Sequence, residues 1–404
     1  MRIYGKTLPE IFSMLPFAYK MVVIVGTCFF VFALPYSLNF FFTVGRVVQH
    51  VEPVQFPGLA DNNIGVLDPA MASDGQQVIL AHTVIDSAVV DGKRQLAPHV
   101  VFERAVSPCR SWMTMNNGGF PVQTVEIMGP DSVTPLDHGS WVSETPGIVY
   151  DPDDKGQEWK AFAYKYYWIG QNANNDGIAR LYSVISMRSA TDPSGNWTPE
   201  QWLFSASASA PPPPYGSLVP GHINSMSPQL ADVYFYSRPS VVYSRGALFM
   251  SLSAFTGNKK TPDRVIMLAS TDHGKSWVYI GTPIRQSDVS LISPEYTTLA
   301  GATLLVKDNK ILLAAVLGGK DSDGLGTFLI DFKDPTTAEL VRDEKTTAPI
   351  VLLHAPRNSS APSRTGGGFA AYADICKTGM LVSEFSEIRR AFQIFKTYKQ
   401  PVAE

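Results

Sequence analysis

The sequence predicts an all-β domain folded as a β-propeller, preceded by one N-terminal transmembrane helix. Short β-rich segments bounded by Gly, Asp, Asn and Pro recur, and no amphipathic helical pattern longer than about a dozen residues competes with them. One sequence pattern, in which a proline at a strand entrance is followed by a polar turn and an alternating strand, occurs three times, and two weaker copies bring the total to five. Because each copy leaves room for four short strands, five blades are predicted, with a diverged sixth blade as the alternative.

The repeated pattern fixes the expected order of the blades. Successive copies are spaced by roughly 60 to 90 residues and begin at Leu67, Glu144, Ser237, Leu299 and Gly366. A second hairpin that ends on tryptophan follows each of the first three copies, at Trp112, Trp197 and Trp277. A proline-rich stretch at 205–216 interrupts this order. Since proline cannot join a central strand, we interpret that stretch as a stiff surface excursion.

The segment from Met21 to Val44 has 24 residues and no charge. At about 1.5 Å per residue it can cross a bilayer, and it is longer than the apolar core of a cleavable signal peptide. Arg2, Lys6 and Lys20 precede it, which places the N-terminus in the cytoplasm. We therefore expect a single-pass membrane protein with a cytoplasmic segment at 1–20, an uncleaved signal-anchor at 21–44, a linker at 45–60, and a propeller at 61–398 in the periplasm or extracellular space.

Charge and cysteine content narrow the classes of partner. The formal net charge is −3 and no dense basic patch occurs, which excludes nucleic acid as a partner. Of three cysteines, Cys28 falls in the apolar span. Cys109 and Cys376 remain as the pair available in an oxidising compartment, either as a disulfide or as two unrelated buried thiols.

The run STDHGKSW carries the pattern Ser270, Asp272, Gly274 and Trp277. It reads as a strand end, a tight turn in which the aspartate bonds its own backbone and the glycine takes positive φ, and a return strand that begins with a buried tryptophan. The pattern resembles the Asp-box of sialidase-type propellers. That resemblance implies an architecture rather than an activity.

Two acidic residues stand at strand entrances. Asp68 immediately precedes Pro69, and Glu144 lies two places before Pro146. In a propeller the entrances of the inner strands converge around the axis, which makes them the default site. Carboxylates from different blades that meet there are the groups that glycoside hydrolysis requires.

These strand entrances and the regular spacing of the predicted blades resemble those of the five-bladed glycosidases of the arabinanase, xylosidase and invertase superfamily. The resemblance implies that Asp68 acts as base or nucleophile and Glu144 as general acid. The alternatives are a turn-initiating aspartate and a solvated loop acid.

The sequence departs from that superfamily where a third aspartate is expected, because Arg238 stands before the proline of a middle blade. An arginine there favours a carboxylate ligand or a pair with one of the two acids. Sialidases bind a substrate carboxylate with three arginines. The candidates for these three positions are Arg238, Arg364 and Arg104. The Phe-Arg-Ile-Pro signature of sialidases is absent, so their chemistry ranks lower.

Further candidates surround this expected site. His138 and His222 are candidates to face the channel and hold a cation or a sugar hydroxyl, against the alternative of ordinary loop histidines. Trp141 is a candidate for sugar stacking, although alternate aromatic residues of a strand normally face the core between blades.

The sequence predicts no cofactor, with a cation such as calcium in the central channel as the alternative. Asp151, Asp153 and Asp154 lack the spacing and the closing glutamate of a calcium loop, and we interpret them as a solvated turn.

The leading functional hypothesis is a membrane-anchored, externally facing propeller that binds a glycan or polysaccharide and hydrolyses it with paired carboxylates. One alternative is a non-catalytic propeller that binds a partner protein or a polysaccharide in a cell-envelope complex. Another is a sialidase-like hydrolase. Fold alone does not decide among them, because propellers host both catalysis and binding.

Overall fold

The computed structural model of the chain describes residues 2–3, 6–7, 46–47, 50–59, 65–90, 93–106, 109, 111–128, 135–169, 179–211, 215–257, 261–319, 325–355, 369–376, 379–386 and 391–397. The chain divides into two compact units, residues 1–45 and 46–404. In the first unit β1 (Arg2–Ile3) pairs with β2 (Lys6–Thr7). The expected span from Met21 to Val44 lies outside the described residues. No helix within the described ranges is long and apolar enough to cross a membrane.

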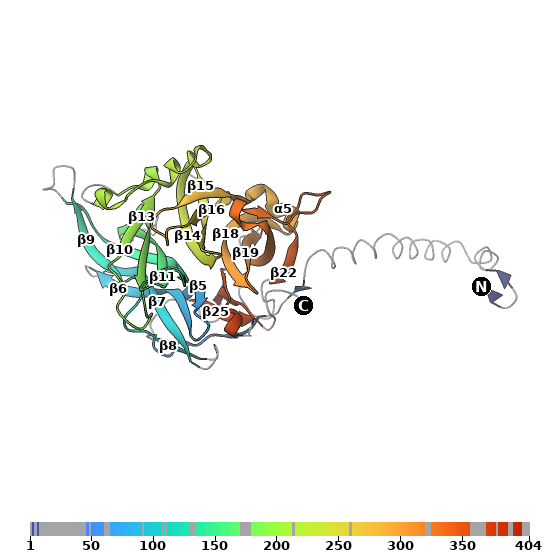
Figure 1. Ribbon diagram of the computed structural model, residues 1–404, viewed down its shortest axis with the longest axis horizontal. Helices are drawn as coiled ribbons and strands as arrows, with labels where there is room; N and C mark the ends of the chain where they lie inside the picture. Colours follow the sequence, from blue (N-terminus) through green and yellow to red (C-terminus); the bar gives the residue numbers. More distant parts are fainter. Residues whose placement is uncertain are drawn as a thin grey trace. The chain divides into compact units, whose positions relative to one another are not determined.

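The second unit is mostly β, and consecutive strands pair in antiparallel sheets (Figure 1). The first sheet holds β5 (Gly65–Ser73), β6 (Val78–Val90), β7 (Lys93–Val106) and β8 (Ser111–Thr114). The second holds β9 (Gln123–Met128), β10 (Pro135–Tyr150), β11 (Trp159–Ile169), β12 (Ala179–Ala190) and β13 (Gln201–Ser205). The third holds β14 (Val233–Ser244), β15 (Ala247–Thr256), β16 (Arg264–Ser270) and β17 (Val278–Arg285).

Two further sheets complete the unit. The fourth holds β18 (Tyr296–Lys307), β19 (Lys310–Gly319), β20 (Leu325–Asp334), β21 (Glu339–Leu340) and β22 (Val351–Ala355). The fifth holds β23 (Ala370–Ala371), β24 (Leu381–Ser386) and β25 (Ala391–Thr397), and β25 joins it to the first sheet. The short helix α5 (Val289–Ile292) leads into β18.

The inner strands of the five sheets follow one another in a closed cycle. Along the chain, β5 contacts β10, β10 contacts β14, β14 contacts β18, and β18 contacts β23. The strand β23 in turn contacts β5, which closes the cycle. This is the arrangement of inner strands in a β-propeller.

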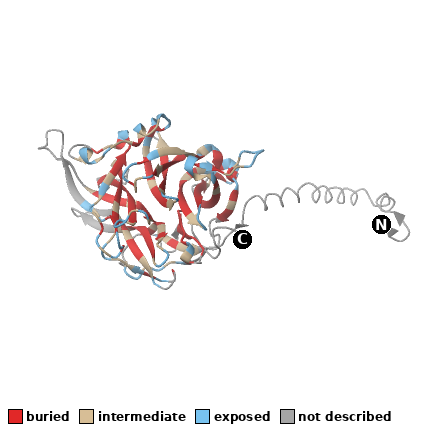
Figure 2. Ribbon diagram, viewed as in Figure 1, coloured by how far each residue is buried: buried red, intermediate tan, exposed pale blue. Residues whose placement is uncertain are grey.

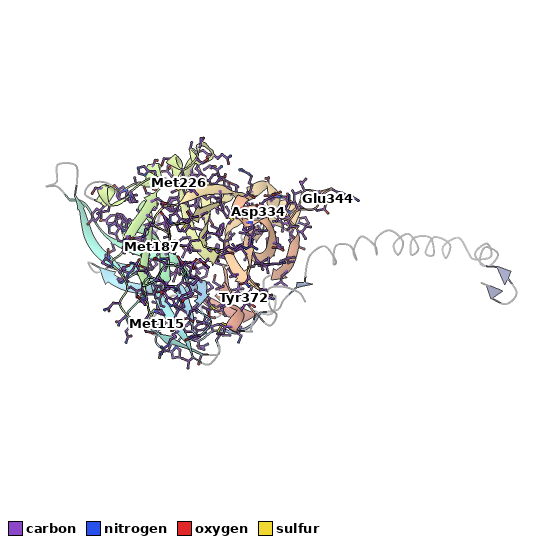
Figure 3. The ribbon with its side chains drawn as sticks, in the orientation of Figure 1. Met115, Met187, Met226, Asp334, Glu344 and Tyr372 are labelled. Carbon is purple, nitrogen blue, oxygen red and sulfur yellow. A yellow bond between two sulfur atoms is a disulfide. The ribbon has the colours of Figure 1, made fainter. Side chains whose placement is uncertain are left out.

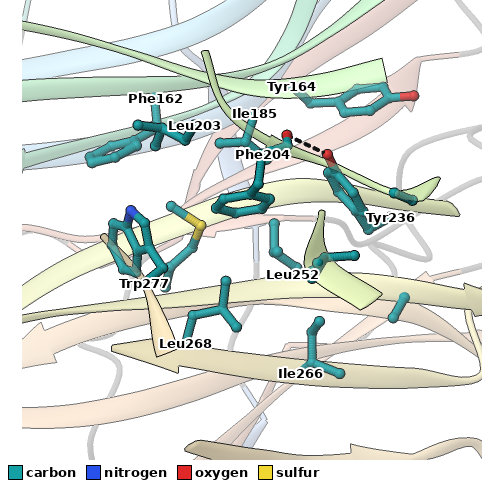
Figure 4. Close-up of a cluster of buried hydrophobic side chains, with 14 of the residues drawn as sticks. Phe162, Tyr164, Ile185, Leu203, Phe204, Tyr236, Leu252, Ile266, Leu268 and Trp277 are labelled. Atoms are coloured by element: carbon teal, nitrogen blue, oxygen red, sulfur yellow. Dashed lines mark hydrogen bonds between the residues drawn. The ribbon is translucent and has the colours of Figure 1, made fainter. Parts of the chain in front are cut away.

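Sheets in this arrangement are buried on both faces, and buried residues run along their strands (Figure 2). In β11, Ala161 and Ala163 belong to the core between the first and second sheets, whereas Phe162 belongs to the core between the second and third. In that second core Phe162 packs with residues of β15 and β16 (Figure 4), and Tyr236 donates a hydrogen bond of 2.8 Å to the carbonyl of Phe204. Burial on both faces explains why the strands read as nearly continuous apolar runs.

The STDHGKSW run forms the turn between β16 and β17. Gly274 has a φ of 90°, and the buried Trp277 donates its indole N–H to the Gly274 carbonyl at 3.0 Å. Asp272 accepts hydrogen bonds from the backbone N–H and the hydroxyl of Ser276. Burial opposes its ionisation, but these bonds and one from Ser270 hold the pKa of Asp272 below its ordinary value. The turn is therefore stabilised by hydrogen bonds to the Asp272 carboxylate and by the buried indole ring of Trp277.

The two ends of the second unit meet. β25 pairs in parallel with β5 at Phe392 and Gly65, and β4 (His50–Pro53) pairs with β25. β3 (Arg46–Val47) pairs with β22 of the fourth sheet. Part of the expected linker is thus paired strand, because the edges of β22 and β25 offer backbone groups that need partners.

A disulfide also links the first and fifth sheets. It joins Cys109, just before β8, to Cys376, with a Cα–Cα distance of 5.3 Å and a sequence separation of 267 residues. Both cysteines are buried in one apolar cluster with Trp112. The disulfide therefore links covalently the same two sheets whose inner strands, β5 and β23, close the cycle through non-covalent contacts.

We expect replacement of Cys109 and Cys376 together by serine to lower the free energy of unfolding by about 2–5 kcal/mol, because the disulfide closes a long loop of the unfolded chain. Guanidinium titration of wild type and double variant measures the change. As a control, a reductant should lower the wild-type midpoint and leave the variant unaffected. A wild-type midpoint that ignores the reductant would contradict a stabilising disulfide.

Candidate axial site

Three inner strands share the same irregularity at their entrances. The pairing register breaks in β5 after Leu67, in β10 after Glu144 and in β14 after Ser237. At each break a non-glycine residue with positive φ precedes a proline: Asp68 (53°), Thr145 (50°) and Arg238 (63°). Proline lacks the N–H that the ladder needs and restricts the residue before it. The chain therefore turns away from regular pairing at the same point in all three sheets.

When the first and second sheets are aligned on these prolines, Glu144 is not the equivalent of Asp68. The residue that corresponds to Asp68 in the second sheet is Thr145, whereas Glu144 still lies in the ladder opposite Tyr164. Glu144 is half-buried, and its Oε2 accepts a hydrogen bond from the Tyr166 hydroxyl at 3.2 Å. Tyr164 and Tyr166 belong to the core between the second and third sheets. Because cross-strand partners share a face, Glu144 lies on the side of β10 that faces the third sheet.

Asp68, Thr145, Arg238 and Phe369 together line a small cavity of about 10 Å³ at the entrances. Asp68 is only 6% exposed. The Arg238 guanidinium carbon lies 3.9 Å from the centre of the Phe369 ring, and its Nη1 donates to the Ala300 carbonyl at 2.9 Å. The cavity has room for about one water molecule.

The chemistry of this cavity is polar and charged. A carboxylate from the first sheet and a guanidinium from the third lie at one opening, so the site can hold a polar ligand through charge-assisted hydrogen bonds. Thr145 is held in place by its backbone N–H, which donates to the Thr83 hydroxyl at 2.9 Å. A β-branched residue with positive φ is rare, and its presence here marks the entrance as strained.

Other predicted site residues lie elsewhere. Arg364 and the side chain of His138 fall outside the described residues. Arg104 lies on β7, the third strand of its sheet, away from the entrances. His222, a candidate to face the channel, lies instead beside β13, the outermost strand of the second sheet, where its Nδ1 is 2.8 Å from the Ser205 hydroxyl, as the alternative of an ordinary loop histidine predicts.

The prediction that Trp141 offers an exposed surface for sugar stacking is wrong. Its side chain is 1% exposed. The ring packs against Tyr167, Trp202 and Tyr215, with centroid distances of 5.5, 4.9 and 5.8 Å. Strand alternation places Trp141 in this aromatic cluster, where it stabilises the second sheet.

The expected solvated turn of aspartates is buried at its first residue. Asp151 is 1% exposed, and His273 Nδ1 of the Asp-box turn lies 3.0 Å from its Oδ2. Ligand atoms of Asp151, Asp154 and His273 lie within 4.8 Å of one another, the spacing of a possible cation site. Lys160 already pairs with Asp154, and the group links the second sheet to the third through protein contacts.

Comparisons with known proteins return structural likeness only. No family model matches, and no curated protein matches. Similar solved structures include a family 117 glycoside hydrolase of Zobellia galactanivorans (12% identity, 88% of this chain and 91% of that chain, TM-score 0.45). They also include the intramolecular trans-sialidase of Ruminococcus gnavus (8%, 87% and 98%, 0.45) and the β-fructofuranosidase of Bombyx mori (10%, 86% and 61%, 0.45). Glycosidases and sialidases are the two classes that the sequence motifs resemble, but the proposal below rests on this chain's own residues.

We expect Arg238→Lys to lower the free energy of unfolding by about 1–2 kcal/mol, because lysine loses the planar contact with Phe369 and the hydrogen bond to Ala300. The matched control is Arg245→Lys, an exposed arginine that also has positive φ, which should change stability by less than about 0.5 kcal/mol. Urea titration compares the two. Equal losses would show that the side-chain contacts of Arg238 contribute nothing.

Proposed function

We propose that the chain forms a five-bladed propeller that binds a glycan at the axial entrances and hydrolyses a glycosidic bond. The observation that carries this proposal is the set of three strained, non-glycine entrances at Asp68, Thr145 and Arg238, which converge on one cavity. Strained residues persist where the surrounding structure over-determines them, and they cluster at functional sites.

In this proposal Asp68 acts as base or nucleophile and Glu144 as proton donor. Asp68 is buried beside the axis, where a substrate carbon would have to lie. Glu144 is half-buried and receives a hydrogen bond from Tyr166, which orients one carboxyl oxygen. Arg238 would bind an acidic or hydroxyl group of the sugar.

A second candidate is a non-catalytic propeller that binds a partner protein or a polysaccharide in a cell-envelope complex. The observation that favours it is the volume of about 10 Å³ at the entrance, far below that of a sugar ring. Hydrolysis therefore requires Arg238 to leave Phe369 when substrate binds. A sialidase-like hydrolase has less support, because Arg104 lies away from Arg238.

We further propose that residues 21–44 anchor the protein in a membrane, with the propeller in the periplasm or extracellular space. The length and lack of charge of that segment support the proposal, as do the basic residues that precede it.

If the glycosidase proposal is right, Asp68→Asn and Glu144→Gln each lower kcat by on the order of a hundredfold or more, because neither amide can exchange the proton. Melting temperatures should stay nearly unchanged. Activated aryl leaving groups need little protonation, so they should partly rescue Glu144→Gln but not Asp68→Asn. Turnover of aryl furanosides, pyranosides and sialosides by the purified proteins is the measurement.

Two variants serve as matched controls. Asp308→Asn changes an exposed aspartate that also has positive φ, and Glu339→Gln changes an exposed glutamate. Both should retain wild-type turnover. Absence of any wild-type turnover, or equal activity of all variants, would favour the non-catalytic candidate instead.

We expect added protease to digest the propeller in spheroplasts, or on the corresponding outward face of intact cells, while a cytoplasmic marker stays intact. The bilayer would shield only residues that precede the second unit. Detection of tagged protein by immunoblot gives the result. Recovery of the intact chain in the soluble cytoplasmic fraction would refute both the anchor and the location.

A further inference from the structure

A second and much larger cavity lies farther along the inner strands, beyond the entrances. Its volume is about 500 Å³, and all five sheets contribute to its wall. Segments 70–73, 148–150 and 240–243, which follow the entrance prolines of the first three sheets, line it together with segments 304–306 and 370–375 of the fourth and fifth sheets. Asp68, Thr145 and Arg238 do not line it. The volume falls within the range of about 300–1,000 Å³ that is typical of small-molecule sites.

The wall of this cavity is mostly apolar and is built from small or aliphatic residues. Ala70, Ala72 and Ala371 contribute from the first and fifth sheets, and Ile148 and Leu304 from the second and fourth. Alanines on inner strands leave space that larger side chains would fill. Apolar cavities of this kind bind neutral apolar molecules, because water gains few hydrogen bonds inside them.

Three tyrosines, Tyr150, Tyr243 and Tyr372, add aromatic surface from three different sheets (Figure 3 labels Tyr372). Tyr243 donates its hydroxyl to Asp153 at 2.5 Å, and this bond, ahead of burial, raises the pKa of Tyr243. Burial, followed by a hydrogen bond to Asp374, raises the pKa of Tyr372. Both rings therefore stay neutral at physiological pH.

The wall also offers hydrogen-bonding groups. Within the described part of the chain, β14 pairs only with β15 and β18 only with β19, so one backbone edge of each has no strand beside it. The one charged residue among the described wall residues is Asp374, whose Oδ2 accepts a hydrogen bond from the backbone N–H of Asp308 at 3.0 Å and which also hydrogen-bonds Tyr372. This carboxylate disfavours an anionic ligand, whereas a neutral ligand with a polar group can hydrogen-bond backbone groups at the strand edges.

We propose that this cavity binds a neutral small molecule that has an aromatic ring and one or two hydrogen-bonding groups, such as a phenol. Rings pack favourably in offset or edge-to-face geometry against tyrosines, which favours an aromatic body over an acyl chain. The ligand site adjoins the entrance cavity, with which it shares Pro69 and Ser240, but it does not depend on glycan hydrolysis.

The test uses the full chain and 4-hydroxybenzophenone, a phenol that crosslinks to nearby C–H bonds under ultraviolet light, in a mildly acidic buffer that keeps its hydroxyl protonated. Peptide mass spectrometry should map crosslinks to segments 70–73, 240–243 or 370–375. An aromatic competitor with one hydroxyl, 2-naphthol, should suppress them, whereas 1-decanol, an aliphatic competitor with one hydroxyl, should not. Ala70→Phe, which fills the cavity from its wall, should reduce crosslinking at least tenfold.

Ala97→Phe is the matched control, because Ala97 is a half-buried alanine on β7 outside the cavity wall. It should crosslink like wild type. Val306→Phe fills the cavity from the fourth sheet and replaces Ala70→Phe if that variant does not fold. Crosslinks spread over the surface, crosslinks unchanged by both filling variants, or suppression by 1-decanol alone would each overturn the proposal.

Discussion

Closure of the cycle of sheets is the constraint on which the rest of the structure depends. Each sheet exposes apolar residues on both faces, so an open row of five sheets would leave two large faces in water. Contacts between β23 and β5 cover those faces. The parallel pairing of β25 with β5 and the disulfide from Cys109 to Cys376 hold the same junction. The axis, with its narrow entrance and its wider apolar cavity, exists only because this junction is closed.

The entrances show how local backbone chemistry builds a site. The register of regular pairing shifts at the same place in three inner strands, and there Asp68, Thr145 and Arg238, each followed by a proline, adopt left-handed conformations. The side chains then project where the strands converge. The same backbone irregularity, repeated in three sheets, thus brings a carboxylate, a hydroxyl and a guanidinium to one cavity. Phe369 of the fifth sheet also lines it.

Much of this architecture could be predicted from the sequence, because its signals are local. Prolines mark three of the five inner strands, and the Asp-box run specifies its own turn. The sequence pairs Glu144 with Asp68 because both are acids close to an entrance proline, but the residue directly before that proline, Thr145, is the structural equivalent of Asp68. The features of the site that local sequence signals do not predict are determined by tertiary packing. The burial of Trp141 and the closeness of Phe369 to Arg238 depend on sheets that are remote in sequence, and no local pattern records them.

The position of the disulfide also sets how the second unit responds to mechanical load. A pull on its N-terminal end first strains the pairing of β3 with β22 and of β4 with β25. If those strands detach, the first sheet can peel strand by strand from β5 to β7. Peeling then stops at Cys109, because that residue is bonded to the last sheet. The load then passes through the disulfide to Cys376 in the fifth sheet, so the second, third and fourth sheets, which lie between the two cysteines in the chain, stay outside the loaded path.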